Sequence, residues 1–184
     1  MKCYLCGGNG DIKQQKGRSV CKACFCRLLE KRIRKHARVN KLFSKDDRIL
    51  VTGDVNKYLV KSILKDLPVK LFFKRKEDKK FIKEKNINKV VVEWTMDDEN
   101  NRFMKGIFND ESYEKMPEKY VKLLIAVTDD EIKKFAEIKK LDFKENKKDK
   151  DVQGLLDKVE KKHPNIKYNL LRNIKGLNKL TDGS

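Results

Sequence analysis

The sequence predicts an α/β protein: a small doubly wound, mainly parallel sheet, preceded by an N-terminal zinc ribbon and a basic helix. From residue 48 onward, short apolar runs alternate with segments of helical periodicity, as strands connected by helices do. The run at 89–94 is nearly continuously apolar, which is typical of a parallel strand covered on both faces. All five cysteines lie between residues 3 and 26, ahead of this α/β region.

Four of the cysteines, Cys3, Cys6, Cys21 and Cys24, form two Cys-x-x-Cys pairs. In a zinc ribbon each such pair bends the backbone so that two sulfurs reach one tetrahedral ion. Two disulfide bonds would suit a secreted chain, but no signal peptide precedes the first pair, and no apolar run approaches the roughly 20 residues that span a membrane. We therefore expect one structural Zn²⁺ on these four thiolates, with an iron–sulfur cluster as the alternative. Cys26 is expected to be a packed small residue.

Residues 25–40 predict a helix, because Phe25, Leu29 and Ile33 recur at helical spacing. The other face of this helix carries a cluster of cations: Arg27, Lys31, Arg32, Arg34, Lys35 and Arg38. The whole chain has 46 Lys and Arg against 28 Asp and Glu, a formal net charge of +18. This surplus favours a nucleic-acid partner, and we expect the cluster to contact phosphates. The alternatives are a solvated helix face and a chain that is rich in lysine throughout. His36 is expected to add to the basic surface.

Downstream of this helix the elements follow in order. Apolar runs predict strands at 48–51, 69–73, 89–94 and 121–125. Helical periodicity predicts helices at 57–67, 77–85, 97–108, 128–140, 152–163 and 168–180. Thr95 and Asp97 are candidate N-caps, and Thr128 and Glu131 have capping-box spacing. We expect a zinc ribbon at 1–26, a basic connecting helix at 27–46, an α/β domain at 47–143 and a C-terminal helical segment at 144–184.

The turn at 52–57 follows the first strand of the predicted sheet, where α/β proteins place phosphates against a helix N-terminus. Its only glycine is Gly53, and Asp54 puts a carboxylate where an anion would approach. Lys57 offsets part of that charge. By its residues alone, this turn is a weak phosphate loop.

The ribbon followed by Phe25, the turn Asp97-Asp98-Glu99 after the third strand, and the stretch 128–143 together resemble the cytosolic tRNA 2-thiolation family. Further matches are Glu160, His163, Pro164, Leu170 and Leu171. That family belongs to the N-type ATP pyrophosphatases, and it groups ATP-dependent thiouridine synthetases with non-catalytic partner subunits. The resemblance extends from Cys3 to about Leu177, and it implies a pyrophosphatase-like fold at 47–143 with its PP-loop at 52–57.

The departures from the family are as informative as the matches. Active members carry Ser-Gly-Gly-Lys-Asp-Ser where this chain has Thr52-Gly53-Asp54-Val55-Asn56-Lys57. The resemblance therefore implies a degenerate nucleotide-binding set: Thr52, Gly53, Asp54, Asn56, Lys57, Asp97 and Asp98. Glu93 puts a carboxylate where active members have a small residue near the nucleotide, and no cysteine follows Cys26 to hold a catalytic cluster or carry sulfur. For Asp97 and Asp98 we prefer helix capping and compensation of the helix dipole.

The resemblance and its departures lead to one expected function and two alternatives. We expect a degenerate family member, a pseudoenzyme that binds tRNA or acts as a scaffold in tRNA uridine 2-thiolation, because the losses favour a protein that is not an enzyme. It is expected to be cytoplasmic, to hold one Zn²⁺ without ATP and Mg²⁺, and to form a hetero-oligomer with an active thiolase paralogue or a homodimer. The first alternative is a residual ATP-binding, thiolase-like enzyme with Asp97 or Asp98 on magnesium. The second is a zinc-ribbon nucleic-acid-binding module unrelated to thiolation.

Overall fold

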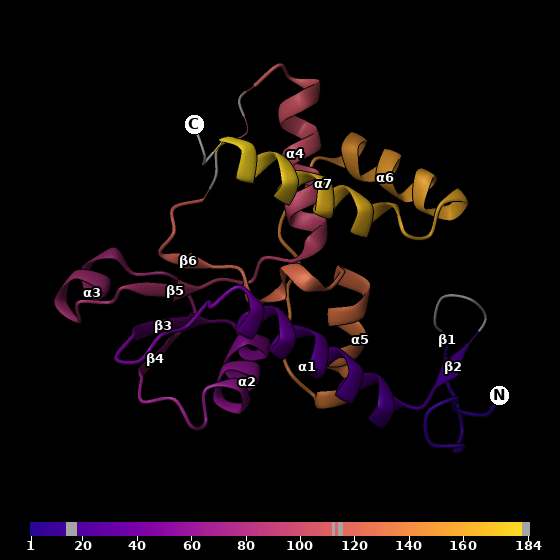
Figure 1. Ribbon diagram of the computed structural model, residues 1–184, viewed down its shortest axis with the longest axis horizontal. Coiled ribbons are helices and arrows are strands. Elements are labelled where there is room, and N and C mark those ends of the chain that lie inside the picture. Colours follow the sequence, from indigo (N-terminus) through magenta and orange to yellow (C-terminus); the bar gives the residue numbers. More distant parts are fainter. Residues whose placement is uncertain (14–17, 112, 114–115, 182–184) are drawn as a thin grey trace.

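The computed structural model of the chain describes residues 1–13, 18–111, 113 and 116–181, and for residues 178–181 it describes the backbone alone. Its centre is a four-stranded sheet of β3 (Arg48–Thr52), β4 (Lys70–Lys74), β5 (Lys89–Val91) and β6 (Tyr120–Val121) (Figure 1). The strand order is β4-β3-β5-β6, and all the pairings are parallel. The chain passes from β3 to β4 on one side of β3 and then returns to form β5 on the other side of β3. This reversal creates a topological switch point between β3 and β5.

Successive residues of the central strands are buried against opposite faces of the sheet, as the continuous apolar runs predict. Ile49 and Val91 belong to a large core that also contains α1 (Lys22–Val39), α2 (Asp54–Ile63) and α5 (Asp129–Lys139). Leu50 and Val90 belong to a smaller cluster on the other face, which includes Phe81 of α3 (Lys79–Glu84). The predicted fold class, an α/β protein with a mainly parallel sheet, is confirmed.

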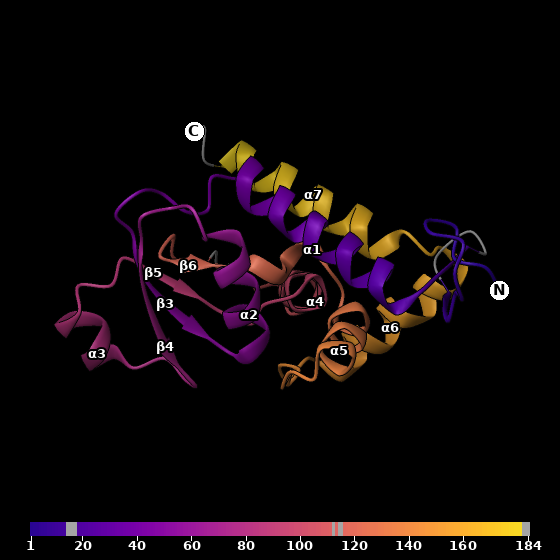
Figure 2. The same cartoon turned by 90° about the horizontal axis from the view of Figure 1, so that it is seen from below.

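The N-terminal segment is a small antiparallel unit of β1 (Ile12–Lys13) and β2 (Ser19–Val20) that leads directly into α1. Figures 1 and 2 show this segment at one end of the molecule and α3 at the opposite end. Cys3, Val20 and Phe25 nevertheless belong to the same apolar core as the sheet. The ribbon and the first turns of α1 are therefore packed onto the α/β region.

The strand predicted at 121–125 is wrong beyond its first residue. After β6 the chain forms a 3₁₀ helix, η2 (Leu123–Ala126), whose Leu123 and Leu124 have no exposed surface. This helix packs between α1 and α4 (Met96–Phe108). A short apolar run shows only that its residues are buried, so periodicity does not separate a strand from a buried helical turn. The turn after β3 is also shorter than predicted: Gly53 has φ +79°, and α2 begins at the next residue.

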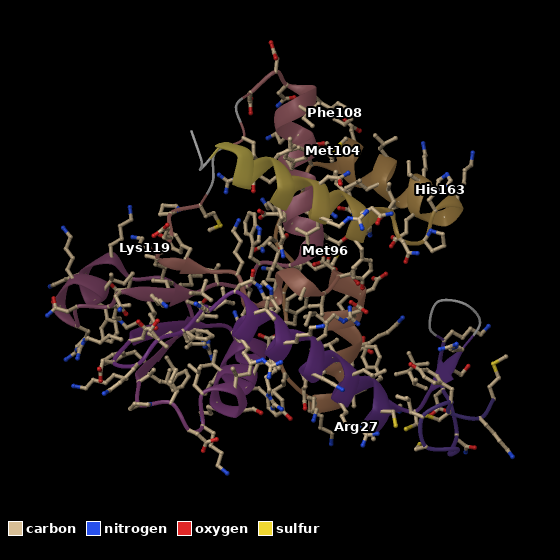
Figure 3. The ribbon with its side chains drawn as sticks, viewed as in Figure 1. Arg27, Met96, Met104, Phe108, Lys119 and His163 are labelled. Atoms are coloured by element: carbon tan, nitrogen blue, oxygen red, sulfur yellow. The ribbon has the colours of Figure 1, made fainter. Side chains whose placement is uncertain are left out.

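The C-terminal part consists of α6 (Lys150–Lys162) and α7 (Ile166–Thr181), and α7 packs on α4. In Figure 3, Met96 lies where α4 meets the sheet region and Phe108 at its far end, so α4 projects away from the sheet. Among the described residues, no helix is long and apolar enough to cross a membrane.

Three consecutive carboxylates begin α4, and we call Asp97, Asp98 and Glu99 the acidic triplet. Each residue exposes 4% of its surface or less. Each carboxylate pairs with a different lysine: Asp97 with Lys167 at 2.7 Å, Asp98 with Lys148 at 2.9 Å, and Glu99 with Lys122 at 2.7 Å. These lysines come from α7, from the connecting segment 144–149 and from the residues after β6, so the triplet ties three distant parts of the chain together.

Replacing Lys167 by Met is expected to lower the free energy of unfolding by about 3–5 kcal/mol, because it leaves the Asp97 carboxylate buried without its counterion. Urea unfolding followed by circular dichroism measures the change. The matched control is Lys162→Met on the exposed surface of α6, which is expected to change stability by less than about 0.5 kcal/mol. Equal stabilities of the two variants would show that the triplet does not hold α7 in place.

Candidate functional site

The four predicted metal ligands lie together at the N-terminal end of the molecule. The sulfurs of Cys3, Cys6, Cys21 and Cys24 are all within 4.8 Å of one another, and the Sγ atoms of Cys6 and Cys21 are 3.7 Å apart. Gly7 has φ +76° and donates its N–H to the Cys3 carbonyl at 2.9 Å, which closes the turn of the first pair. The second pair is part of α1, where Cys21 is the N-cap and its sulfur accepts the N–H of Cys24. The donor set fits a metal ion.

The protonation of these thiols is uneven. Hydrogen bonding from the Cys21 backbone is the main cause that lowers the pKa of Cys3 to about 6, whereas desolvation raises the pKa of Cys24 to about 12. At neutral pH Cys3 is thus a ready thiolate, which is the form that binds a metal. Cys26 faces the core with 4% of its surface exposed, and burial raises the pKa of its thiol. The prediction that Cys26 is a packed residue is confirmed.

The basic helix is α1, and it divides the six predicted phosphate contacts into two groups. Five of the side chains are exposed: Arg27, Lys31, Arg34, Lys35 and Arg38. Figure 3 shows Arg27 at the end of α1 that joins the N-terminal segment, and its guanidinium lies 3.4 Å from the Cys24 sulfur. Arg34 reaches the neighbouring helix, where it donates to Ser62 Oγ at 3.0 Å.

Arg32 is half-buried and is held by partners within the protein. Its guanidinium donates two hydrogen bonds of 2.8 Å to the carboxylate of Glu131 and a third of 2.8 Å to Tyr168 Oη. These contacts join α1 to α5 and α7, so Arg32 lies apart from the five exposed cations.

The expectation that His36 adds to the basic surface is wrong. Burial and the nearby Lys175 lower the pKa of His36 to about 4, which leaves its imidazole neutral.

A pocket of about 620 Å³ lies at the carboxyl ends of β3, β4 and β5, and we call it the sheet-edge pocket. From the predicted nucleotide-binding set, Gly53, Asp54 and Lys57 line it, together with Glu93. A larger group of cations completes the wall: Lys74, Arg75, Lys76 and Lys144. The pocket therefore occupies the position at which open α/β sheets bind ligands.

The other members of the predicted set have internal partners. Thr52 Oγ1 donates to the Val91 carbonyl, and the fully buried Asn56 donates to the Thr52 carbonyl, each at 3.0 Å. These contacts stabilise the turn between β3 and α2 from within.

Thr95 is the N-cap of α4, as predicted, whereas the other candidate, Asp97, lies inside the helix. Asp98 completes the capping box, because its carboxylate accepts the Thr95 N–H at 2.8 Å. Asp97 accepts the Asp129 N–H at 2.7 Å. The capping prediction is thus confirmed for Asp98.

A second hollow of about 800 Å³ lies between α5 and α6, on the other side of the connecting segment 144–149. Asp97, Asp129, Lys148 and Lys167 line it, and Lys148 also pairs with Asp129 at 2.6 Å. Burial opposes the charged form of Lys167, but its contacts with Asp97 and then with Glu160 outweigh burial and raise its pKa. The acidic residues of this hollow are therefore largely neutralised from within.

Sequence reasoning missed Lys122, Lys148 and Lys167. The only signal in the sequence was the acidic triplet itself, because three adjacent carboxylates at a helix start need counterions if they are buried. Which lysines supply them depends on how distant segments pack, and a chain with 46 Lys and Arg offers many candidates.

No protein-family model matches the sequence, and no curated protein matches it. Among solved structures, the chain is similar to the U34-tRNA thiolase NcsA from Methanococcus maripaludis with its [4Fe-4S] cluster. The TM-score is 0.74 at 17% sequence identity, and the match covers 96% of this chain and 87% of that chain. At this identity the likeness shows that the chain has the fold of a tRNA thiolase.

This likeness corrects one expectation from the sequence. The altered loop at 52–57 and the lack of cysteines after Cys26 favoured a protein that is not an enzyme. That prediction is wrong, because a solved structure that shares the fold over nearly the whole chain is an enzyme with an iron–sulfur cluster.

The purified chain is expected to contain one metal ion, because the four clustered sulfurs form one ligand set. Cys24→Ser is expected to remove the ion, since it deletes one of four thiolates, and inductively coupled plasma mass spectrometry on the purified proteins measures it. Cys26→Ser is the matched control, because this thiol lies only two residues away but packs in the core. Retention of the ion in the Cys24 variant, or its loss in the Cys26 variant, would contradict the assignment.

Proposed function

We propose that this protein binds tRNA through the exposed face of α1 and acts in the 2-thiolation of tRNA uridine. The observation that carries the proposal is a row of exposed cations that starts at the metal site, in a chain with the fold of a tRNA thiolase. Neither feature is sufficient alone, because the fold does not define the ligand and a basic helix does not define the kind of nucleic acid.

The cations of α1 have the spacing of a continuous stripe. Arg27, Lys31, Arg34 and Arg38 follow one another at intervals of four, three and four residues, so they lie on one side of the helix. At 1.5 Å per residue this row extends over about 16 Å. Arg32 is bound to the carboxylate of Glu131, whereas the four cations of the stripe are exposed and pair with no carboxylate among the described residues, so they are available to an external anion. A phosphate backbone provides anions along such a line.

We propose Zn²⁺ as the ion at the four cysteines. Four thiolates at the usual Zn–S distance on a tetrahedron have sulfurs about 3.8 Å apart. The Sγ atoms of Cys6 and Cys21 are 3.7 Å apart, and all four sulfurs lie within 4.8 Å. A four-iron cluster binds each thiolate to a separate iron and spaces the sulfurs more widely. Zinc would fix the first turn of α1, because Cys21 and Cys24 both belong to it.

Assembly and location are part of the same proposal. The partner is a thiolase paralogue or a second copy of this chain, and the site of action is the cytoplasm. Within the chain, residues 1–26 and 27–46 would supply metal and tRNA contacts, 47–143 the ligand-binding sheet, and 144–184 a helical support.

A second candidate function is that of an ATP-binding, thiolase-like enzyme, and the sheet-edge pocket is the observation that favours it. The pocket lies beside the switch point of the sheet, and five of its side chains are cationic: Lys57, Lys74, Arg75, Lys76 and Lys144. Such a lining attracts a polyphosphate. Isothermal titration calorimetry with ATP tests this candidate, and the absence of ATP binding would contradict it.

Replacing Lys31, Arg34 and Arg38 together by Gln is expected to weaken tRNA binding and to reduce the slope of log K against log salt by about two, since three phosphate contacts are lost. Filter binding over a range of salt concentrations measures both quantities.

The matched control for this triple variant removes the same charge from α3, at the opposite end of the molecule, as Lys79, Lys80 and Lys83 to Gln. It is expected to leave the slope nearly unchanged. An equal loss of tRNA affinity in both triple variants would mean that binding depends on net charge and not on the α1 stripe. Equal affinity of the wild type for tRNA and duplex DNA would contradict the tRNA assignment.

Deletion of the gene is expected to lower the 2-thiouridine content of tRNA, because the proposed function places this protein in the thiolation step. Mass spectrometry of nucleosides from purified tRNA measures it. The wild-type gene is expected to restore the modification, and the Lys31, Arg34 and Arg38 variant is not. Unchanged 2-thiouridine in the deletion strain would overturn the thiolation role while leaving tRNA binding intact.

A further inference from the structure

The carboxyl group of Glu93 lies directly over the backbone of Gly53, where β3 turns into α2. A Cβ atom added to Gly53 would overlap the Glu93 carboxyl group. Because Gly53 has φ +79° and no side chain, the backbone at this turn is open to close approach, and Glu93 fills the opening. The Glu93 side chain comes from the residues after β5, so two neighbouring strands bring the contact about.

The surroundings of this carboxyl group are those of an anion position. It lies at the N-terminus of the ten-residue helix α2, which carries partial positive charge, and the N-cap Gly53 makes no side-chain capping bond. The sheet-edge pocket around it contributes Lys57 of α2, Lys74, Arg75 and Lys76 after β4, and Lys144 of the connecting segment. The carboxylates that face it are Asp54 of α2 and Asp142 after α5.

Glu93 is nevertheless poorly bound as an anion. Its Oε1 atom is buried and accepts no hydrogen bond from the described residues. On its backbone side, Asn146 of the connecting segment donates to the Glu93 carbonyl at 2.6 Å, which holds the residue in place. The carboxyl group therefore lies at the N-terminus of α2 although its buried oxygen lacks a hydrogen bond, as expected of a group that an incoming ligand can displace.

We propose that Glu93 is a tethered anion that occupies the phosphate position of the sheet-edge pocket, so that a polyphosphate enters only when this carboxyl group is neutral or has moved aside. The inference rests on the second candidate function, the binding of a phosphate-bearing ligand in this pocket. It adds a regulatory element that the pocket alone does not imply: occupancy that depends on the proton concentration near neutrality.

The titration of Glu93 gives this dependence its direction. Burial, followed by the charges of Asp142 and Asp54, raises the pKa of Glu93 to about 7. Above this pH the carboxylate is charged and repels an incoming phosphate, and below it the neutral group no longer competes for the helix N-terminus. The neutral form makes up about nine-tenths of the protein at pH 6 and about one-tenth at pH 8. If only this form is competent, apparent affinity falls about tenfold across that range.

The test measures binding of inorganic tripolyphosphate at pH 6 and pH 8 by isothermal titration calorimetry with the full-length chain. Glu93→Gln keeps the size of the side chain and is neutral at both pH values. At pH 8 this variant is expected to bind about tenfold more tightly than the wild type, and at pH 6 the two are expected to agree within about twofold. Comparing the two proteins at each pH cancels the titration of the ligand itself.

Glu84→Gln on α3 is the matched control, because it removes the same charge from an exposed position outside the pocket. It is expected to bind like the wild type at both pH values. If the wild type and Glu93→Gln bind equally at pH 8, Glu93 is not a competing anion, although the pocket still takes the polyphosphate. If neither protein binds at either pH, the pocket is not a phosphate site, and both the inference and the second candidate function fail.

Discussion

The structure depends on the neutralisation of three buried carboxylates in a row. The acidic triplet Asp97, Asp98 and Glu99 opens α4 in the interior, where unpaired charges would be prohibitively costly. Each carboxylate therefore needs a lysine, and each lysine arrives on a different segment. These ion pairs tie α7, the segment 144–149 and the residues after β6 to the start of α4. In return the carboxylates stabilise the start of α4, whose N-terminus favours negative charge.

The same constraint shapes the candidate site. Lys148 forms ion pairs with Asp98 and Asp129, which holds the segment 144–149 across the carboxyl ends of the sheet strands. Lys144 then lines the sheet-edge pocket on one side, whereas Lys148 lines the hollow between α5 and α6 on the other. Asn146 bridges the two by donating to the Glu93 carbonyl and to Asp98. The segment 144–149 thus separates the sheet-edge pocket from the acidic triplet. Through Asn146 it also fixes the backbone of Glu93, whose side chain lies in that pocket.

Local spacing predicted the features that depend on neighbours in the sequence. The cysteine pairs, the capping box of Thr128 and Glu131 and the alternation of strands and helices each arise within a few residues, and the structure contains them. Features that depend on partners far along the chain were not predicted. Arg32 has the same spacing as its exposed neighbours, yet it pairs with Glu131, 99 residues away. The residues of η2 were predicted to form a strand because a helical turn that is buried on all sides has the same continuous apolar sequence as a buried strand.

The candidate metal site and the basic helix are continuous in the chain: Cys21 is the N-cap of α1, Cys24 lies in its first turn, and the exposed cations follow along the same helix. Ultraviolet crosslinking of the full-length chain to tRNA, with mass spectrometry of the crosslinked peptides, tests this connection most directly. If α1 is the tRNA-binding surface, crosslinks are expected to concentrate in this helix between Arg27 and Arg38. Crosslinks confined to α6, α7 or α3, with α1 unmodified, would contradict it.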